Sequence, residues 1–172
     1  AALGELRKAG GPEAEQLALM QAQLLLQQNK PDAAIALLVP LSRRPGARDA
    51  TMLLLMAYKI GQKAMEADAL IVTAISKGTL KPLEIAGALV ESGDTQGATK
   101  VLEDAMKAQT PDPAAASMLA MIYTASGDKK AAEALRDGLV ARKPANADEL
   151  RKSIDEAIAG ATEEMAAIQK EE

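Results

Sequence analysis

A break between two helix-forming segments recurs four times along this chain at nearly constant spacing. The breaks fall, at intervals of 32, 32 and 34 residues, at Asn29, Gly61, Gly93 and Gly127. Glycine and asparagine tolerate the left-handed backbone conformation that ends a helix, so each break predicts the turn of a helical hairpin. Five or six positions after each break stands a small residue: Ala34, Ala67, Ala98 and Ala132. This recurrence predicts four copies of one helical hairpin. In each copy the alanine would let the second helix pack closely against its neighbour.

The composition agrees with helix-on-helix packing. Apolar residues make up 48% of the chain, yet it contains no Phe or Trp and only two Tyr. A core of Ala, Leu, Ile and Met suits close helix packing, whereas a sheet favours β-branched and aromatic residues. We therefore expect an all-α fold.

Composition also narrows the classes of function. Cysteine and histidine are both absent, which excludes disulfides, thiolate nucleophiles and imidazole chemistry. The formal charge of −4 gives no reason to expect nucleic acid or an anionic membrane as partner. No apolar run approaches the roughly 20 residues that span a bilayer.

The helices expected from apolar periodicity and from turn residues span 13–28, 31–41, 49–60, 64–76, 83–91, 95–108 and two segments within 113–146. In the first of these, the residues spaced by three and four are Leu17, Met20, Leu24 and Leu25. Asp49 and Asp128 are the expected caps of their helices. Pro40 is expected to kink or shorten the second helix. Residues 1–8 read either as a short helix or as a frayed terminus, and the absence of an initiating Met suggests a piece of a longer protein.

The last hairpin carries the most specific pattern. Its residues are Leu119, Ala120, Tyr123, Gly127, Asp128, Ala132, Leu139 and Pro144. On these residues the chain resembles the tetratricopeptide repeat family, and weaker versions of the pattern extend the resemblance over residues 13–146. It implies an all-α, right-handed solenoid of about four antiparallel hairpins, preceded by a remnant helix and linker at 1–12. The large aromatic residue usual in the first helix of such repeats is missing from all four.

The resemblance also implies a concave surface lined by the first helix of each hairpin. The residues expected there are Leu19, Gln23, Leu26, Met52, Met56, Lys59, Leu83, Gly87, Val90, Ser117, Met121 and Thr124. This lining is apolar and contains methionine, which adapts its shape to varied partners. An amphipathic helix or an extended peptide would fit it. Alternatively, these residues pack against one another or against a neighbouring chain.

Residues 147–172 depart from the repeat and read as one long helix. A single apolar stripe runs along it through Leu150, Ile154, Ile158, Ala161, Met165 and Ile168. Its other faces are charged and mainly acidic. We expect a helix that caps the exposed apolar face of the last hairpin, with docking to another subunit as the alternative. Gly160 is expected to weaken this helix.

The sequence offers no active site. No phosphate-binding loop is present, and carboxylate pairs such as Glu103–Asp104 are neighbours that point about 100° apart on a helix. No cofactor, metal or catalysis is expected. We therefore predict a non-enzymatic scaffold that binds a protein or peptide. The resemblance is to bacterial members, which implies an envelope role in secretion, pilus assembly or exopolysaccharide export, with the periplasm favoured over the cytoplasm. The alternative is a structural module of a larger protein that self-associates through its C-terminal helix.

Overall fold

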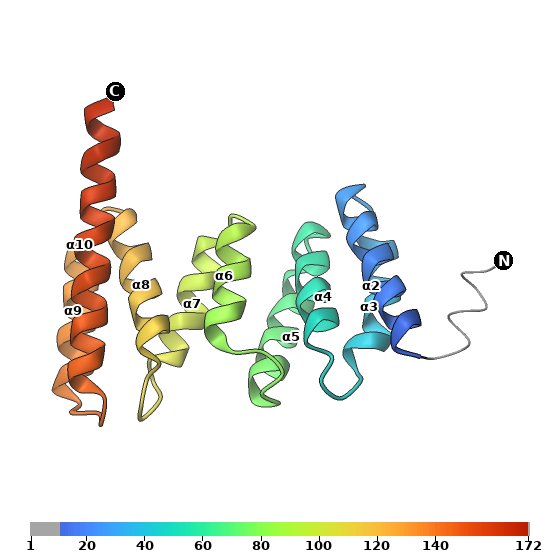
Figure 1. Cartoon of the computed structure of the whole chain (residues 1–172), viewed down its shortest axis with the longest axis horizontal. Helices are drawn as coiled ribbons and strands as arrows, with labels where there is room; N and C mark the ends of the chain where they lie inside the picture. Colours follow the sequence, from blue (N-terminus) through green and yellow to red (C-terminus); the bar gives the residue numbers. More distant parts are fainter. Residues whose placement is uncertain (1–10, 172) are drawn as a thin grey trace. The chain divides into compact units, whose positions relative to one another are not determined.

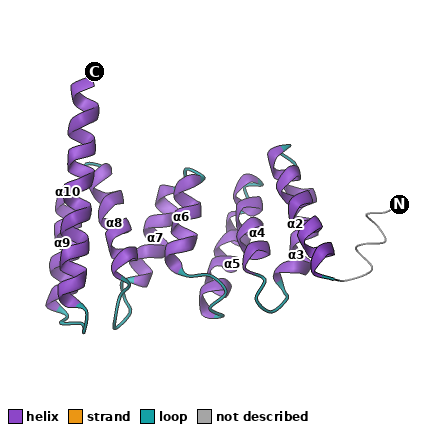
Figure 2. Cartoon of the chain, viewed as in Figure 1, coloured by secondary structure: helices purple, strands orange, loops and turns teal. Residues whose placement is uncertain are grey.

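The computed structural model describes residues 11–171, and every regular element within that range is a helix (Figures 1 and 2). The helices are α2 (Pro12–Gln27), α3 (Pro31–Ser42), α4 (Arg48–Ile60), α5 (Ala64–Ser76), α6 (Pro82–Glu91), α7 (Thr95–Ala105), α8 (Pro113–Ala125), α9 (Lys129–Ala141) and α10 (Ala147–Glu171). The all-α helical repeat is thus confirmed. The helix expected at residues 1–8 lies outside the described residues, and the right-handed superhelix stays a prediction.

The chain divides into two compact units between Lys81 and Pro82. In the first unit, hairpin α2–α3 is followed by hairpin α4–α5, and α3 packs against α4. In the second, hairpins α6–α7 and α8–α9 are followed by α10, which lies along both α8 and α9 (Figure 1). Each unit therefore repeats the same helical hairpin and builds its core between consecutive hairpins.

The turns inside the four hairpins share the same backbone conformation. A residue with positive φ, between 55° and 83°, ends the first helix at Asn29, Gln62, Gly93 and Gly127. The next N–H donates to the carbonyl five residues back, as from Lys30 to Leu25 (2.8 Å) and from Asp128 to Tyr123 (2.9 Å). This pair of features is the Schellman motif, which satisfies carbonyls that a helix end would leave unpaired.

The predicted break at Gly61 is confirmed, because α4 ends at Ile60 and Gly61 is its C-cap. Gly61 itself has φ −77°, and the left-handed conformation falls on the next residue, Gln62. Gly61 is constrained by space instead, because a Cβ there would lie 3.1 Å from the Ala57 carbonyl oxygen and 3.4 Å from the Pro31 Cβ. The glycine therefore allows the end of α4 to approach the start of α3.

With Gln62 as the turn residue, the spacing becomes regular. In all four hairpins a wholly buried alanine follows the left-handed residue by five positions, at Ala34, Ala67, Ala98 and Ala132. Each of these alanines has 0% of its surface exposed. This complete burial agrees with the expected close packing at these positions, because protein interiors are densely packed.

The packing face of α2 differs from the prediction. Leu17, Met20 and Leu24 are exposed, whereas Ala22 is buried in a cluster with residues of α3 and α4 such as Leu38 and Leu54. Helix α2 carries apolar residues at helical spacing on two faces, so periodicity alone did not identify the face that packs. Leu25, the fourth residue of the predicted stripe, packs against the cluster as expected.

The predicted helix ends were partly right. The side chain of Asp128 accepts a hydrogen bond from the Ala131 N–H and caps α9 as expected. Asp49 is not a cap: the N-cap of α4 is Ala47, and Asp49 lies in the first turn, where a carboxylate still favours the helix dipole. Pro40 lies inside α3 without shortening it. Helix α7 ends at Ala105 rather than at residue 108.

Helix α10 covers the end of the second unit. Its residues Leu150, Ile154, Ile158 and Ala161 are buried, and it packs against α8 and α9. The predicted capping helix is confirmed, and Gly160 does not interrupt it. The helix continues past the ends of α8 and α9 (Figure 1), and there Ile168 is 62% exposed.

Candidate functional site

In the first unit, helices α2 and α4 bring together three of the residues predicted to bind a partner. Leu19, Gln23 and Met52 line one surface depression of about 340 Å3. The remaining lining residues are Gln16, Met20, Asp49 and Leu53. Leu19 and Leu53 also pack against the core cluster, so the depression has a fixed floor. Asp49 is the one charged residue in this lining, and the surface is therefore mainly apolar with amide groups.

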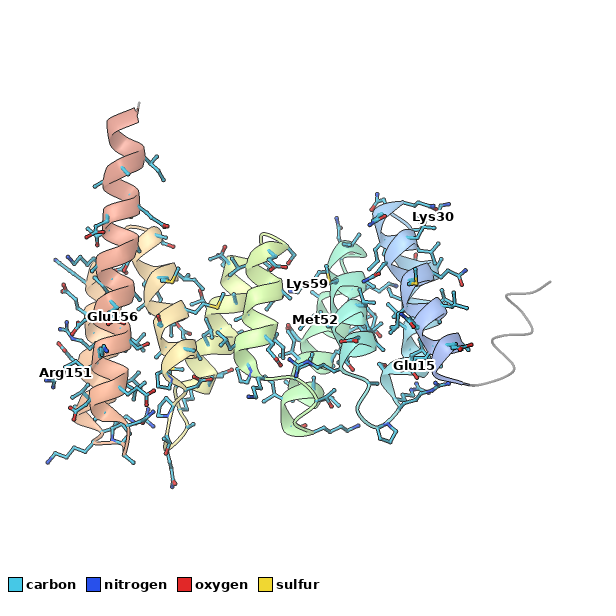
Figure 3. The ribbon with its side chains drawn as sticks, in the orientation of Figure 1. Glu15, Lys30, Met52, Lys59, Arg151 and Glu156 are labelled. Carbon is cyan, nitrogen blue, oxygen red and sulfur yellow. The ribbon has the colours of Figure 1, made fainter. Side chains whose placement is uncertain are left out.

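The other three predicted residues of this unit lie outside the depression. Leu26, Met56 and Lys59 are half-buried and do not line the depression. Leu26 packs against the buried cluster, so part of its surface already serves the core. Met52 and Lys59 lie on the same helix, two turns apart (Figure 3).

In the second unit, the predicted residues fall on α6 and α8. Val90 and Met121 are exposed, and Leu83 and Ser117 are half-buried. A Cβ built at Gly87 would meet nothing within 4 Å. The glycine is therefore not required by packing, and it leaves the backbone of α6 open to a partner.

Thr124 contributes very little to the accessible surface. Only 3% of its surface is exposed, and its hydroxyl donates to the Ala120 carbonyl oxygen of its own helix at 2.8 Å. Because α10 packs beside α8, it encloses the end of α8 that the sequence placed on the concave side. We therefore leave Thr124 out of the candidate surface.

A smaller depression between α8 and α10 was not anticipated from the sequence. It has a volume of about 270 Å3 and is lined by Thr124, Gly127, Lys129, Thr162, Met165 and Ala166. Met165 belongs to the apolar stripe predicted along residues 147–172. That stripe was the sequence feature that could have indicated this depression, because it continues past the residues that the last hairpin covers.

Polar contacts fix the start of α10 onto the second unit. Asn146 donates to the Pro111 carbonyl oxygen at 2.8 Å, and Ser153 donates to that of Pro113 at 3.0 Å. Arg136 on α9 bonds to Asp155 on α10 at 2.7 Å. Hydrogen bonds to Asp137 and to Asp155 raise the pKa of Arg136. These contacts hold the capping helix in register with the hairpin that it covers.

The ionisable groups form pairs within and between helices rather than a reactive cluster. At the surface, Lys107 lowers the pKa of Asp104 by a hydrogen bond, and Asp104 raises that of Lys107 in the same way. Among residues 11–171, no three carboxylate, imidazole or thiolate side chains gather in a way that could hold a metal ion. Over the same range, no helix combines the length and apolar character needed to cross a membrane.

The family assignment comes from residues 89–154, which match the model of the tetratricopeptide repeat. This match, together with the recurring helical hairpins, supports a tetratricopeptide repeat protein. The matched range begins in α6, contains hairpin α8–α9 and ends in α10. No curated protein and no solved structure matches the chain significantly. As tetratricopeptide repeats, these hairpins indicate protein partners, and the family is generally non-catalytic.

Proposed function

We propose that this tetratricopeptide repeat protein is a non-enzymatic scaffold that binds a segment of a protein partner on the first helices of its hairpins. The main support is the depression between α2 and α4, where Leu19, Gln23 and Met52 meet. Exposed Val90 and Met121 supply apolar contacts on the corresponding helices of the second unit. Eleven of the twelve predicted residues stay candidates for binding, six in the first unit and five in the second; Thr124 is left out.

The chemistry of this surface favours a partner with apolar anchors and an accessible backbone. Leu19 and Met52 can receive an apolar side chain, and the flexible thioether of methionine adapts to its shape. Gln16 and Gln23 also line this depression, and each amide both donates and accepts hydrogen bonds. An amphipathic helix or an extended peptide presents these groups together.

The proposal is tested with peptides selected from a displayed random library on the 172-residue protein. Met52→Glu introduces a charge into the depression, so the peptides that bind there should lose at least about tenfold in affinity, equivalent to about 1.4 kcal/mol. Met121→Glu tests the second unit in the same way. The matched control is Met65→Glu, because Met65 is 83% exposed on α5 and lies outside the candidate surface. Equal affinity of the selected peptides for all three variants would contradict the proposal.

Self-association through α10 is the second candidate. It is favoured by Ile168, which continues the apolar stripe of α10 and is exposed. It is weakened by Leu150, Ile154 and Ile158, which are already buried within the chain. Light scattering of Ile168→Glu tests it directly, because loss of a dimer would support this function. The role in a bacterial envelope stays a prediction, since it rests on resemblance alone.

A further inference from the structure

Among the residues that the structure describes, one charged side chain lines the depression between α2 and α4, and its charge is negative. That residue is Asp49, and the rest of the lining is apolar or carries amides, as in Leu19, Gln23 and Met52. Lysine and arginine are missing from this lining. A partner segment that binds here therefore meets a carboxylate beside its apolar anchor, and the charge of the segment decides whether that contact attracts or repels.

The rest of the described chain leaves this carboxylate unpaired. Asp49 is exposed in the first turn of α4, and within residues 11–171 it has no hydrogen bond or ion pair through its side chain. The acid next to this lining on α2 differs: Glu15 forms an ion pair with Arg44 at 2.9 Å. Of these two acids, only Asp49 thus offers its full charge to a partner.

The hairpin does not require an acid at this position. Asp49 lies thirteen residues before the left-handed Gln62, and the corresponding residues of the other three hairpins are Gln16, Leu80 and Ala114. A carboxylate in the first turn of a helix does favour the helix dipole. Three of the four hairpins nevertheless fold without one here. The acid is therefore specific to the hairpin whose first helix lines the depression.

Asp49 and Met52 lie on the same face of α4. Residues three apart on a helix are neighbours, separated by a rise of about 4.5 Å along the axis. In the proposed function, an apolar anchor of the partner packs against Met52. The carboxylate then lies about one helical turn from that anchor. In a helical partner, the residue that reaches Asp49 stands three or four positions from the anchor.

We propose that this depression selects partner segments in which a lysine or arginine lies within four residues of the apolar anchor and pairs with Asp49. The inference rests on the proposed function, because it assigns a charge to the segment bound there. A cation donates hydrogen bonds to the carboxylate and also to the amide oxygens of Gln16 and Gln23. The apolar stem of a long basic side chain can cover Leu19 while its charged end reaches Asp49. A segment with an acid in that place is repelled.

The ion pair contributes more to selection among partners than to affinity. Because Asp49 is exposed, a pair with it remains in contact with water and adds little to binding. Removal of this charge should therefore weaken binding by only about two- to fivefold. Salt screens an exposed pair, so the affinity of a basic peptide should fall as the NaCl concentration rises.

Selection of displayed peptides reads the preferred charge directly. The probe is a library of short peptides with a fixed central leucine and random flanking residues, selected on the 172-residue protein. Within four residues of that leucine, we expect lysine and arginine to exceed aspartate and glutamate by at least about threefold. Asp49→Lys should reverse this preference.

The matched control for the selection is Asp68→Lys. Asp68 is exposed on α5 and lies outside the lining of the depression, and the substitution changes the net charge by the same amount. It should leave the preference for basic residues unchanged. The same charge composition in the peptides selected by Asp49→Lys and by Asp68→Lys would overturn the inference.

Affinities of one selected basic peptide separate this inference from the proposed function. Asp49→Asn should weaken the peptide by about two- to fivefold and reduce its dependence on NaCl, and Asp49→Glu should restore both. If Met52→Glu weakens the peptide and Asp49→Asn does not, the proposed function stands and the preference for a cation is overturned. If neither variant changes the affinity, or no peptide is selected, both proposals fail. Circular dichroism of each variant checks that helicity is retained, because Asp49 lies in the first turn of α4.

Discussion

Tyr123 on α8 donates its hydroxyl hydrogen to the carboxylate of Glu103 on α7, with 2.6 Å between the two oxygen atoms. Burial raises the pKa of Tyr123 from 10.0 to about 12, and the hydrogen bond and negative charge of Glu103 act in the same direction. The contact links two consecutive hairpins of the second unit. It also makes the stability of that unit dependent on pH in the alkaline range.

We expect the free energy of unfolding to fall as the pH rises from about 10 to about 12. The folded protein keeps the Tyr123 proton over this window while the unfolded chain has lost it, so the contribution is complete below pH 10 and gone above about 12. Urea unfolding across this range measures the effect, and Tyr123→Phe should reduce the slope. Because the chain has two Tyr and no Trp, ultraviolet titration follows the phenols directly. Glu103→Gln should move the titration of Tyr123 to lower pH, and an unchanged titration would contradict the contribution assigned to Glu103.

The buried alanines set the spacing between the two helices of each hairpin. Ala132 is wholly buried, so Ala132→Leu should destabilise the protein by about 1–3 kcal/mol through overpacking. Ala134 on the same helix is exposed, and Ala134→Leu should change stability by less than about 0.5 kcal/mol. Chemical denaturation of both variants measures the difference. Similar effects of the two substitutions would show that the position of Ala132 is not tightly packed.

The parts of the fold that follow from local chemistry were predictable from the sequence. Ala98 and Ala132 stand five residues after glycines that end a helix, and the structure buries both alanines. Asp128 caps its helix as its position predicts. These features depend on contacts within one hairpin. They repeat because the two helices of each hairpin pack against each other in the same way.

The predictions from sequence were wrong where contact with a second helix decides which residues are buried. Leu17 and Leu24 have the spacing of a packing face, but only contact with α3 and α4 selects the other face of α2 for the core. Gly61 ends α4 as predicted, but Gln62 adopts the left-handed conformation that glycine usually supplies, and the sequence did not indicate it. Thr124 was left out of the candidate surface for a similar reason: a second element, α10, packs over it. Leu19, Gln23 and Met52 line one depression because of the register of α2 and α4, and their role in binding stays a prediction.

The left-handed residue of the second hairpin offers a stabilising substitution. Gln62 has φ 55°, which costs a non-glycine residue about 1–2 kcal/mol. Glycine removes this cost but loses more entropy on folding, so Gln62→Gly should stabilise the protein by about 0.5–1 kcal/mol. Asn29 has the same φ, and asparagine tolerates it better, so Asn29→Gly should give a smaller gain. Urea denaturation compares the two variants, and a loss of stability in Gln62→Gly would show that its side chain has a contact of greater value.

The capping role of α10 depends on its fully buried side chains, of which Ile154 is one. Ile154 has 0% of its surface exposed and Ile168 has 62%, although both belong to the same apolar stripe. Ile154→Ala should destabilise the protein by about 2–5 kcal/mol, because it removes buried apolar surface and leaves a cavity between α10 and the last hairpin. Ile168→Ala should change stability by less than about 0.5 kcal/mol. Hydrogen exchange locates the effect: the amides of α8 and α10 should lose protection together in Ile154→Ala, since each helix covers the other. Loss confined to α10 would mean that α8 is stable without its cap.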